Sequence, residues 1–181
     1  MSDAILYFLW GHLEHVLAVL LLISRLGDIG TTFLVTPNLS LEANPIMRKL
    51  GWRFAAATLL LCLVPYFNQV VAVLILMPFL MISAGNAGRI WIARALGEGE
   101  YYALLIRAAR QSRPIEAILP MCVSAGFIML TGLVVLLFYP RPSTDWGFWL
   151  GVGIVLYGVS IAFYGTLFVR RLFKQASVAS V

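Results

Sequence analysis

Hydrophobic stretches long enough to cross a lipid bilayer occupy most of this sequence. Of its 181 residues, 61% are hydrophobic and only 12% are charged. A soluble domain has about 25% charged and 45–50% apolar residues, so most of this chain must lie in lipid. Because a bilayer-crossing helix needs about 20 apolar residues, the length allows four to six spans and no separate soluble domain beside them.

Polar and turn-forming segments divide the hydrophobic sequence into five stretches. We therefore predict an all-α fold, a bundle of about five transmembrane helices that form a single integral membrane domain over residues 1–181. The predicted spans are 16–36, 46–67, 70–92, 115–139 and 146–168. Residues 100–112 carry apolar side chains on one helical face and arginines on the other, which predicts a short helix on the membrane surface.

Basic residues are distributed very unevenly between the two sides that five spans define. One side receives Arg141 alone. The side that holds the C-terminus receives Arg48, Lys49, Arg53, Arg89, Arg94, Arg107, Arg110, Arg113, Arg170, Arg171 and Lys174. Because loops rich in Lys and Arg stay in the cytoplasm, we predict a protein of the cell (inner) membrane with its N-terminus outside and its C-terminus in the cytoplasm.

A polar stretch at residues 25–45 interrupts the hydrocarbon. An Asp inside a span costs roughly 2.5–3.5 kcal/mol on insertion scales, so Asp28 must have a partner or a use. Arg25, three residues earlier, is the candidate charge partner. The predicted topology places this stretch and the end of the third span in one layer on the cytoplasmic side. The candidate ligand- or ion-binding residues of that layer are Asp28, Thr31, Thr32, Glu42, Asn44, Asn86 and Arg89.

Two interpretations of this layer remain open. In the first, Asp28 is the charged anchor and Glu42 a second acid, and together with amide and hydroxyl oxygens they hold a hard cation or a polar ligand. Arg89 then serves as a counter-charge, or binds a phosphate or carboxylate. In the second, Asp28 pairs with Arg25 or Arg89, both threonines bond to their own helix, and Asn44 only caps the second span.

The spacing within this layer resembles a protein family. The residues that carry the resemblance are Asp28, Thr31, Thr32, Glu42, Asn44, Pro45 and Asn86. They resemble a small family of bacterial and archaeal membrane proteins of unknown function, with an Asp-x-x-Thr-Thr helix, a Glu-x-Asn-Pro loop and an asparagine in the third helix. The resemblance covers about the first half of the chain. It implies that these positions act as a unit, and it supplies no mechanism.

His12, Glu14 and His15 are candidate metal ligands on the outer side. About 24 Å of helix separates His12 from Asp28, so the two groups cannot share a site within one straight helix. His12 and His15 share a helical face, but two His and one Glu fall short of a full ligand set unless another chain contributes. The alternative is that these are polar residues at the membrane interface.

Motifs for common cofactors are absent from the sequence. Cys62 and Cys122 lie within apolar runs and form no zinc or iron–sulfur motif. Two histidines are too few for a bis-haem bundle, and no nucleotide-binding loop occurs. The cofactor is therefore unknown, with a bound cation as one option. The net charge of +5 comes from residues that flank hydrophobic runs. We therefore expect the chain to interact with the lipid bilayer and not with nucleic acid.

The last span carries Gly147, Gly151 and Gly158 at spacings that allow close helix contacts. These glycines can serve packing within the bundle, which is the first expectation. They can also join protomers of a homo-oligomer or subunits of a larger membrane complex.

Our first hypothesis of function is a non-enzymatic accessory or transport-related protein with a polar ion- or ligand-binding layer on the cytoplasmic side. One alternative is a lipid-active enzyme at the cytoplasmic leaflet, with Asp28 or Glu42 as general base or metal ligand and Arg89 as headgroup clamp. The other is a structural subunit of a larger membrane complex. No nucleophile and no full metal shell can be named, which favours the first hypothesis.

Overall fold

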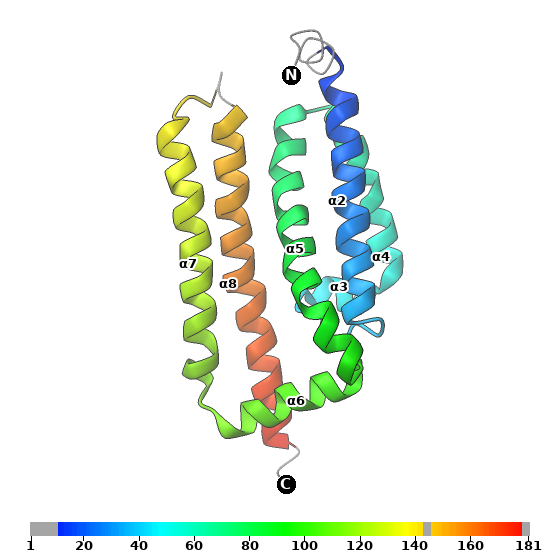
Figure 1. Ribbon diagram of the computed structural model, residues 1–181, viewed down its shortest axis with the longest axis vertical. Helices are drawn as coiled ribbons and strands as arrows, with labels where there is room; N and C mark the ends of the chain where they lie inside the picture. Colours follow the sequence, from blue (N-terminus) through cyan, green and yellow to red (C-terminus); the bar gives the residue numbers. More distant parts are fainter. Residues whose placement is uncertain (1–10, 143–145, 179–181) are drawn as a thin grey trace.

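The computed structural model describes residues 11–142 and 146–178, and every regular element within them is a helix (Figure 1). Four of these helices are long and apolar enough to cross a membrane. They are α2 (Leu13–Val35), α5 (Gln69–Leu96), α7 (Pro114–Phe138) and α8 (Trp146–Val178). The predicted all-α bundle is confirmed, and the chain is a membrane protein.

The predicted second span, residues 46–67, consists of three short helices instead of one long helix. They are α3 (Pro45–Leu50), α4 (Trp52–Ala57) and the 3₁₀ helix η1 (Thr58–Tyr66). Gly51, whose φ of 68° suits glycine, separates α3 from α4. A 3₁₀ helix rises about 2.0 Å per residue against 1.5 Å in an α-helix, so α4 and η1 together reach about 27 Å. They run along the bundle beside α2 and form a fifth pass (Figure 1).

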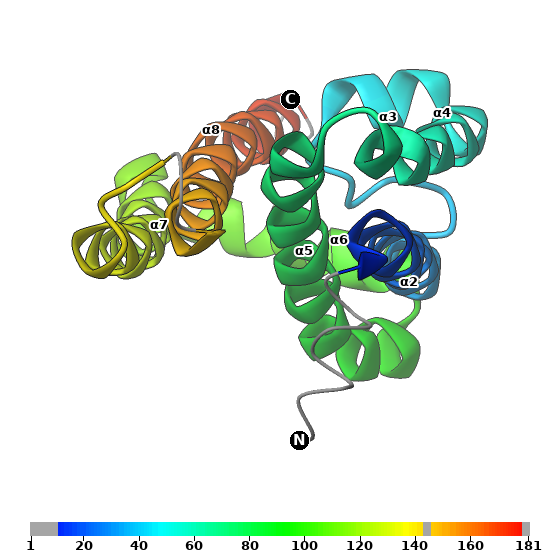
Figure 2. The same ribbon diagram turned by 90° about the horizontal axis from the view of Figure 1, so that it is seen from above.

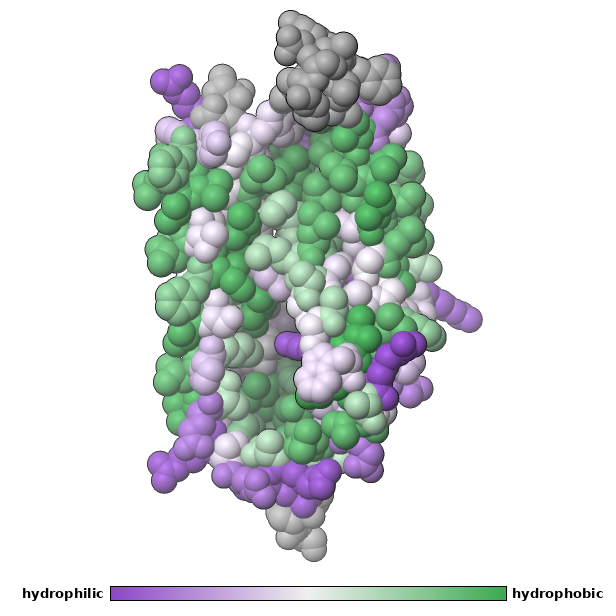
Figure 3. All heavy atoms as spheres, in the orientation of Figure 1, coloured by the Kyte–Doolittle hydropathy of each residue, from purple (hydrophilic) through white to green (hydrophobic). Residues whose placement is uncertain are grey.

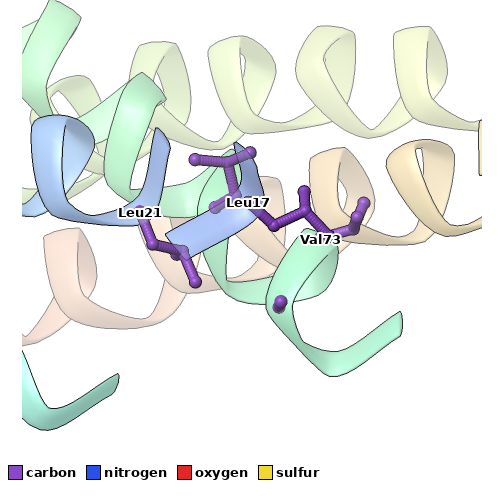
Figure 4. Packing of buried hydrophobic residues seen from close by; sticks show 5 residues of the cluster. Leu17, Leu21 and Val73 are labelled. Carbon is purple, nitrogen blue, oxygen red and sulfur yellow. The ribbon is translucent and has the colours of Figure 1, made fainter. Parts of the chain in front are cut away.

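The helix α5 lies between α2 on one side and α8 on the other (Figure 2). Leu17 and Leu21 of α2 pack against Ala72, Val73 and Leu76 of α5 in a buried cluster (Figure 4). Burying a Leu or Val side chain fully contributes about 1.5–3 kcal/mol in water. In lipid that contribution is largely lost, and close packing holds the helices together instead.

The glycines of α8 face helices of the same chain. A Cβ on Gly151 would lie 3.0 Å from the carbonyl oxygen of Gly132, and a Cβ on Gly158 would lie 3.0 Å from that of Ala125. Gly147 is covered by the aromatic ring that follows α7. These glycines therefore serve contacts between α8 and α7, which is the first of the two expectations for them.

The helix α6 (Glu98–Gln111) crosses one end of the bundle, as the amphipathic pattern predicts (Figure 1). It begins after Gly97, whose φ is 78°, and its apolar side packs Ala109 against Leu172 and Ala176 of α8. This contact explains why α8 continues to Val178, ten residues beyond the predicted span. On the face shown in Figure 3, hydrophilic residues gather at the α6 end and apolar residues cover most of the middle of the molecule.

Candidate functional site

The buried centre of the predicted polar layer is an ion pair between Arg25 and Asp28 on α2. These side chains are only 7% and 6% exposed, respectively. The Arg25 guanidinium donates to Asp28 Oδ2 through Nη1 and to the Thr58 hydroxyl through Nε, at 2.7 Å in the second case. It also lies 4.7 Å from the centre of the Phe79 ring, which attracts a cation over its face. Both charges therefore have partners inside the bundle.

Thr32 and Asn86 extend this ion pair from α2 to α5. The Thr32 hydroxyl donates to Asp28 Oδ1 at 3.4 Å, and Asn86 Nδ2 donates to the Thr32 hydroxyl oxygen at 2.9 Å. One turn earlier on α5, the Ser83 hydroxyl lies 3.2 Å from the Ser24 carbonyl oxygen. We call the group Arg25, Asp28, Thr32, Thr58 and Asn86 the buried polar network. It joins α2, η1 and α5.

Three predicted site residues have local structural roles. The Thr31 hydroxyl donates to the Gly27 carbonyl oxygen at 2.8 Å, within its own helix. The Asn44 side chain accepts the backbone N–H of Ile46 at 2.9 Å and caps α3, ahead of Pro45. Glu42 accepts the Asn44 backbone N–H at 2.7 Å. For Thr31 and Asn44 the second interpretation of the sequence is therefore the one that the structure supports.

Glu42 is the second acid of the layer, although it makes no direct bond to Asp28. Burial raises the pKa of the Glu42 carboxyl, and the nearby negative charge of Asp28 raises it further. The hydrogen bond from Asn44 and the positive charge of Arg25 act in the opposite direction and do not outweigh burial. Glu42 therefore lies within electrostatic reach of the buried polar network and holds a proton more readily than a solvated carboxyl.

Glu98, which the sequence analysis did not single out, holds the loop between α2 and α3. Its carboxylate accepts the backbone N–H of Asn38 at 2.9 Å and that of Ser40 at 2.8 Å, and it also accepts the hydroxyls of Thr36 and Ser40. Partial burial alone would raise the pKa of Glu98. The hydrogen bonds from Ser40, Thr36 and Asn38 together outweigh burial and lower this pKa to about 2.

Arg171 of α8 holds the same loop through its backbone carbonyl oxygens. Its guanidinium donates to the carbonyl oxygens of Ser40 and Glu42, the latter at 3.3 Å, and lies 4.9 Å from the centre of the Phe168 ring. Its Nε is buried and, among the described residues, lacks a hydrogen-bond acceptor. Glu98 and Arg171 thus connect the polar loop to α6 and α8.

Arg89 lies outside the buried polar network. It is exposed on α5, one turn after Gly85, and its charge acts on the hydroxyl of Tyr157 on α8. A Cβ on Gly85 would lie 3.7 Å from that hydroxyl oxygen, whereas a Cβ on Gly88 would meet no atom within 4 Å. Arg25, and not Arg89, is therefore the counter-charge of Asp28.

The outer candidates His12, Glu14 and His15 lie together at the start of α2, at the end of the bundle away from α6 (Figure 1). One ligand atom from each lies within 4.8 Å of the other two. The three side chains are therefore neighbours, near the opposite end of α2 from Asp28.

Thr58, Glu98 and Arg171 were missed because they are distant in sequence from the residues that they contact. Thr58 opens a 3₁₀ helix inside what looks like plain hydrocarbon, and Glu98 resembles an ordinary acidic residue in the first turn of a helix. A hint for Glu98 was available, since it directly follows the helix-breaking Gly97 beside the polar surface segment.

Comparison with protein-family models, with curated proteins and with solved structures finds no match to this chain. The following proposals therefore rest on the chain's own residues.

Proposed function

We propose that this chain is a small multi-pass protein of the inner membrane, accessory or transport-related, that binds an anionic group through Arg89 on the cytoplasmic side. The observation that carries this proposal is the position of Arg89. It is exposed on α5, within electrostatic reach of Tyr157 on α8. Among the described residues the arginines that form ion pairs with acids are Arg25 and Arg107. An exposed guanidinium suits a phosphate or a carboxylate.

The oxygens of the buried polar network offer little to a bound cation. A hard-cation site needs six or more oxygen ligands with free lone pairs. One Asp28 oxygen accepts from Arg25 and the other from Thr32, while the Asn44 oxygen caps α3. Asp28 and Asn44 thus already accept hydrogen bonds, and the network serves as a rigid support for α5.

The distribution of charge supports the cytoplasmic placement. The amphipathic helix α6 and the basic end of α8 lie at the same end of the bundle, together with the loop that Glu98 and Arg171 hold. By the positive-inside rule this end faces the cytoplasm. A ligand at Arg89 then reaches the site from the cytoplasmic leaflet or from the cytoplasm.

The test is ligand binding by purified protein in detergent, followed by native mass spectrometry. Added phosphatidylglycerol is compared with zwitterionic phosphatidylcholine, and inorganic phosphate is added in a separate arm to distinguish a lipid from a free anion. We expect retention of phosphatidylglycerol or phosphate to fall at least tenfold in Arg89→Gln. The matched control Arg110→Gln removes an exposed charge at the same end and is expected to bind normally. Equal binding by both variants contradicts the proposal.

A lipid-active enzyme at the cytoplasmic leaflet is the second candidate, and Glu42 favours it. A carboxyl whose pKa is raised by burial is suited to general acid–base catalysis. This candidate predicts turnover of phosphatidylglycerol by the wild-type protein, detected by thin-layer chromatography, and its loss in Glu42→Gln. Binding without turnover supports the first function.

A further inference from the structure

The cluster at the outer end of α2 has features that the proposed function does not use. His15 Nε2 lies 3.9 Å from Glu14 Oε1, and the rings of His12 and His15 are stacked with centroids 5.9 Å apart. One nitrogen from each histidine and one Glu14 oxygen all lie within 4.8 Å of one another. Around a tetrahedral zinc ion with bonds of about 2.0–2.1 Å, neighbouring ligand atoms are about 3.4 Å apart. His12 and His15 are exposed, so small side-chain rotations can close this difference.

An independent contact orients His15 for such a role. Its Nδ1 lies 2.9 Å from the hydroxyl of Tyr66, which ends η1 and is 51 residues away in the sequence. Histidines that bind metals generally donate their other ring N–H to a nearby acceptor, which fixes the tautomer and directs the ligating nitrogen. If Nδ1–H donates to the Tyr66 oxygen, the lone pair of His15 is on Nε2, the atom that faces Glu14.

We propose that His12, Glu14 and His15 bind a divalent transition metal of the Zn²⁺ class at the outer surface of the inner membrane, with Tyr66 as a positioning residue. Two His and one Glu form a three-ligand set that leaves a fourth position open to water or to an incoming group. The sequence indicated an incomplete set because two His and one Glu are fewer than four ligands. The structure adds the proximity of the three side chains and the Tyr66 contact. Imidazole ligands favour Zn²⁺, Cu²⁺ or Ni²⁺ over Mg²⁺ or Ca²⁺.

The experiment uses full-length protein without a histidine tag, purified in detergent, because a tag would bind the same metals. Isothermal titration calorimetry measures Zn²⁺ binding, and Mg²⁺ is titrated in parallel. We expect one Zn²⁺ per chain, no comparable Mg²⁺ binding, and loss of Zn²⁺ binding in His12→Ala/His15→Ala. The matched control for the acid is Glu100→Gln at the opposite end, which should bind normally, whereas Glu14→Gln should bind at least tenfold more weakly.

Tyr66→Phe tests the positioning role. We expect Zn²⁺ affinity to fall about 10–100-fold, the usual effect of losing an outer-shell partner, while the thermal midpoint of the metal-free protein stays unchanged. Unchanged affinity in Tyr66→Phe overturns the role of Tyr66. Absence of stoichiometric Zn²⁺ binding, or equal binding by the double alanine variant with wild-type helix content, overturns the site.

Discussion

Arg25 and Asp28 are the residues whose placement in this bundle is most costly, and they neutralise each other. The ion pair does not use every hydrogen-bonding group of the two side chains. Arg25 also donates to Thr58, Asp28 also accepts from Thr32, and the guanidinium lies against the Phe79 ring. Breaking such a pair leaves one buried charge without compensation. Removing both charges together avoids that penalty. A comparison of the single and double variants therefore measures the cost of an unpaired buried charge.

We predict that Asp28→Asn lowers the free energy of unfolding by about 3–5 kcal/mol, because it leaves the Arg25 charge buried without a counter-charge. The double variant Arg25→Met/Asp28→Leu should recover most of this loss, since apolar replacements of a buried ion pair are often close to neutral. Yield in membranes and thermal unfolding in detergent measure both effects. Wild-type stability in Asp28→Asn would show that this ion pair is dispensable.

Glu98 is predicted to stabilise the loop between α2 and α3 in a pH-dependent way. Its pKa is lowered from 4.5 to about 2 in the folded protein, so its contribution is complete above pH 4.5 and disappears as the pH falls towards 2. Glu98→Gln should therefore lower the thermal midpoint at pH 7, with the difference from wild type shrinking below pH 4.5. Glu100→Gln serves as the control. Glu100 is also an acid in the first turn of α6, but it is exposed and makes a surface contact with Arg107 at 3.7 Å. An effect of Glu98→Gln that is constant from pH 7 to 3 would argue against charge-assisted anchoring.

Glu42 should show the opposite pH dependence. The pKa of Glu42 is raised in the folded protein, chiefly by burial. Ionisation of Glu42 therefore has no destabilising effect below the pKa of the unfolded chain. The destabilising effect grows as the pH rises towards the pKa of the folded protein. Glu42→Gln keeps an oxygen that accepts the Asn44 N–H and removes the buried charge. We expect a higher thermal midpoint than wild type at pH 8, and little difference at pH 4. A lower midpoint at pH 8 would mean that the negative charge of Glu42 is needed for the fold.

At the scale of helices, α7 and α8 approach closely because glycine alternates with larger side chains along their contact. A Cβ on Gly132 of α7 would lie 2.8 Å from the Gly151 carbonyl oxygen and 2.9 Å from the Val155 backbone nitrogen. Backbone atoms cannot move aside as a flexible side chain can. By contrast, a Cβ on Gly126, two turns earlier on α7, would meet no atom within 4 Å.

We therefore predict that Gly132→Ala separates α7 from α8 and lowers the thermal midpoint, by the equivalent of about 1–3 kcal/mol for an overpacked contact. Gly126→Ala should be neutral or slightly stabilising, because alanine favours a helix over glycine by up to about 1 kcal/mol. Thermal unfolding in detergent compares the two variants. Equal midpoints would contradict the close approach of these helices.

At the scale of the whole molecule, five passes along the bundle put the start of α2 and the end of α8 at opposite ends (Figure 1). In the part of the chain that the structure describes, four long helices provide four of these passes, and α4 and η1 together provide the other. The basic side chains of α6 and of the end of α8 then lie at one end of the bundle.

We predict that the α6 end is cytoplasmic. In a background with Cys62 and Cys122 replaced by alanine, a membrane-impermeant thiol reagent should label Ser112→Cys only after the cells are permeabilised. Arg141→Cys, at the opposite end, should be labelled in intact cells. The reverse pattern would invert the proposed topology and place Arg89 on the outer side.

Hydrophobic run lengths and charge asymmetry by themselves determined the class of this protein: an all-helical membrane bundle with a basic end, an amphipathic crossing helix and a polar layer around Asp28. These properties depend on how each segment partitions between lipid and water, and each segment partitions largely according to its own composition. Only the tertiary structure decided which side chains from distant parts of the chain meet. Thr58 reaches Arg25, Asn86 reaches Thr32, and Glu98 and Arg171 hold the same loop. Those choices depend on helix rotation and on the 3₁₀ geometry of η1, because contacts between residues 33 to 131 positions apart leave no local pattern in the sequence.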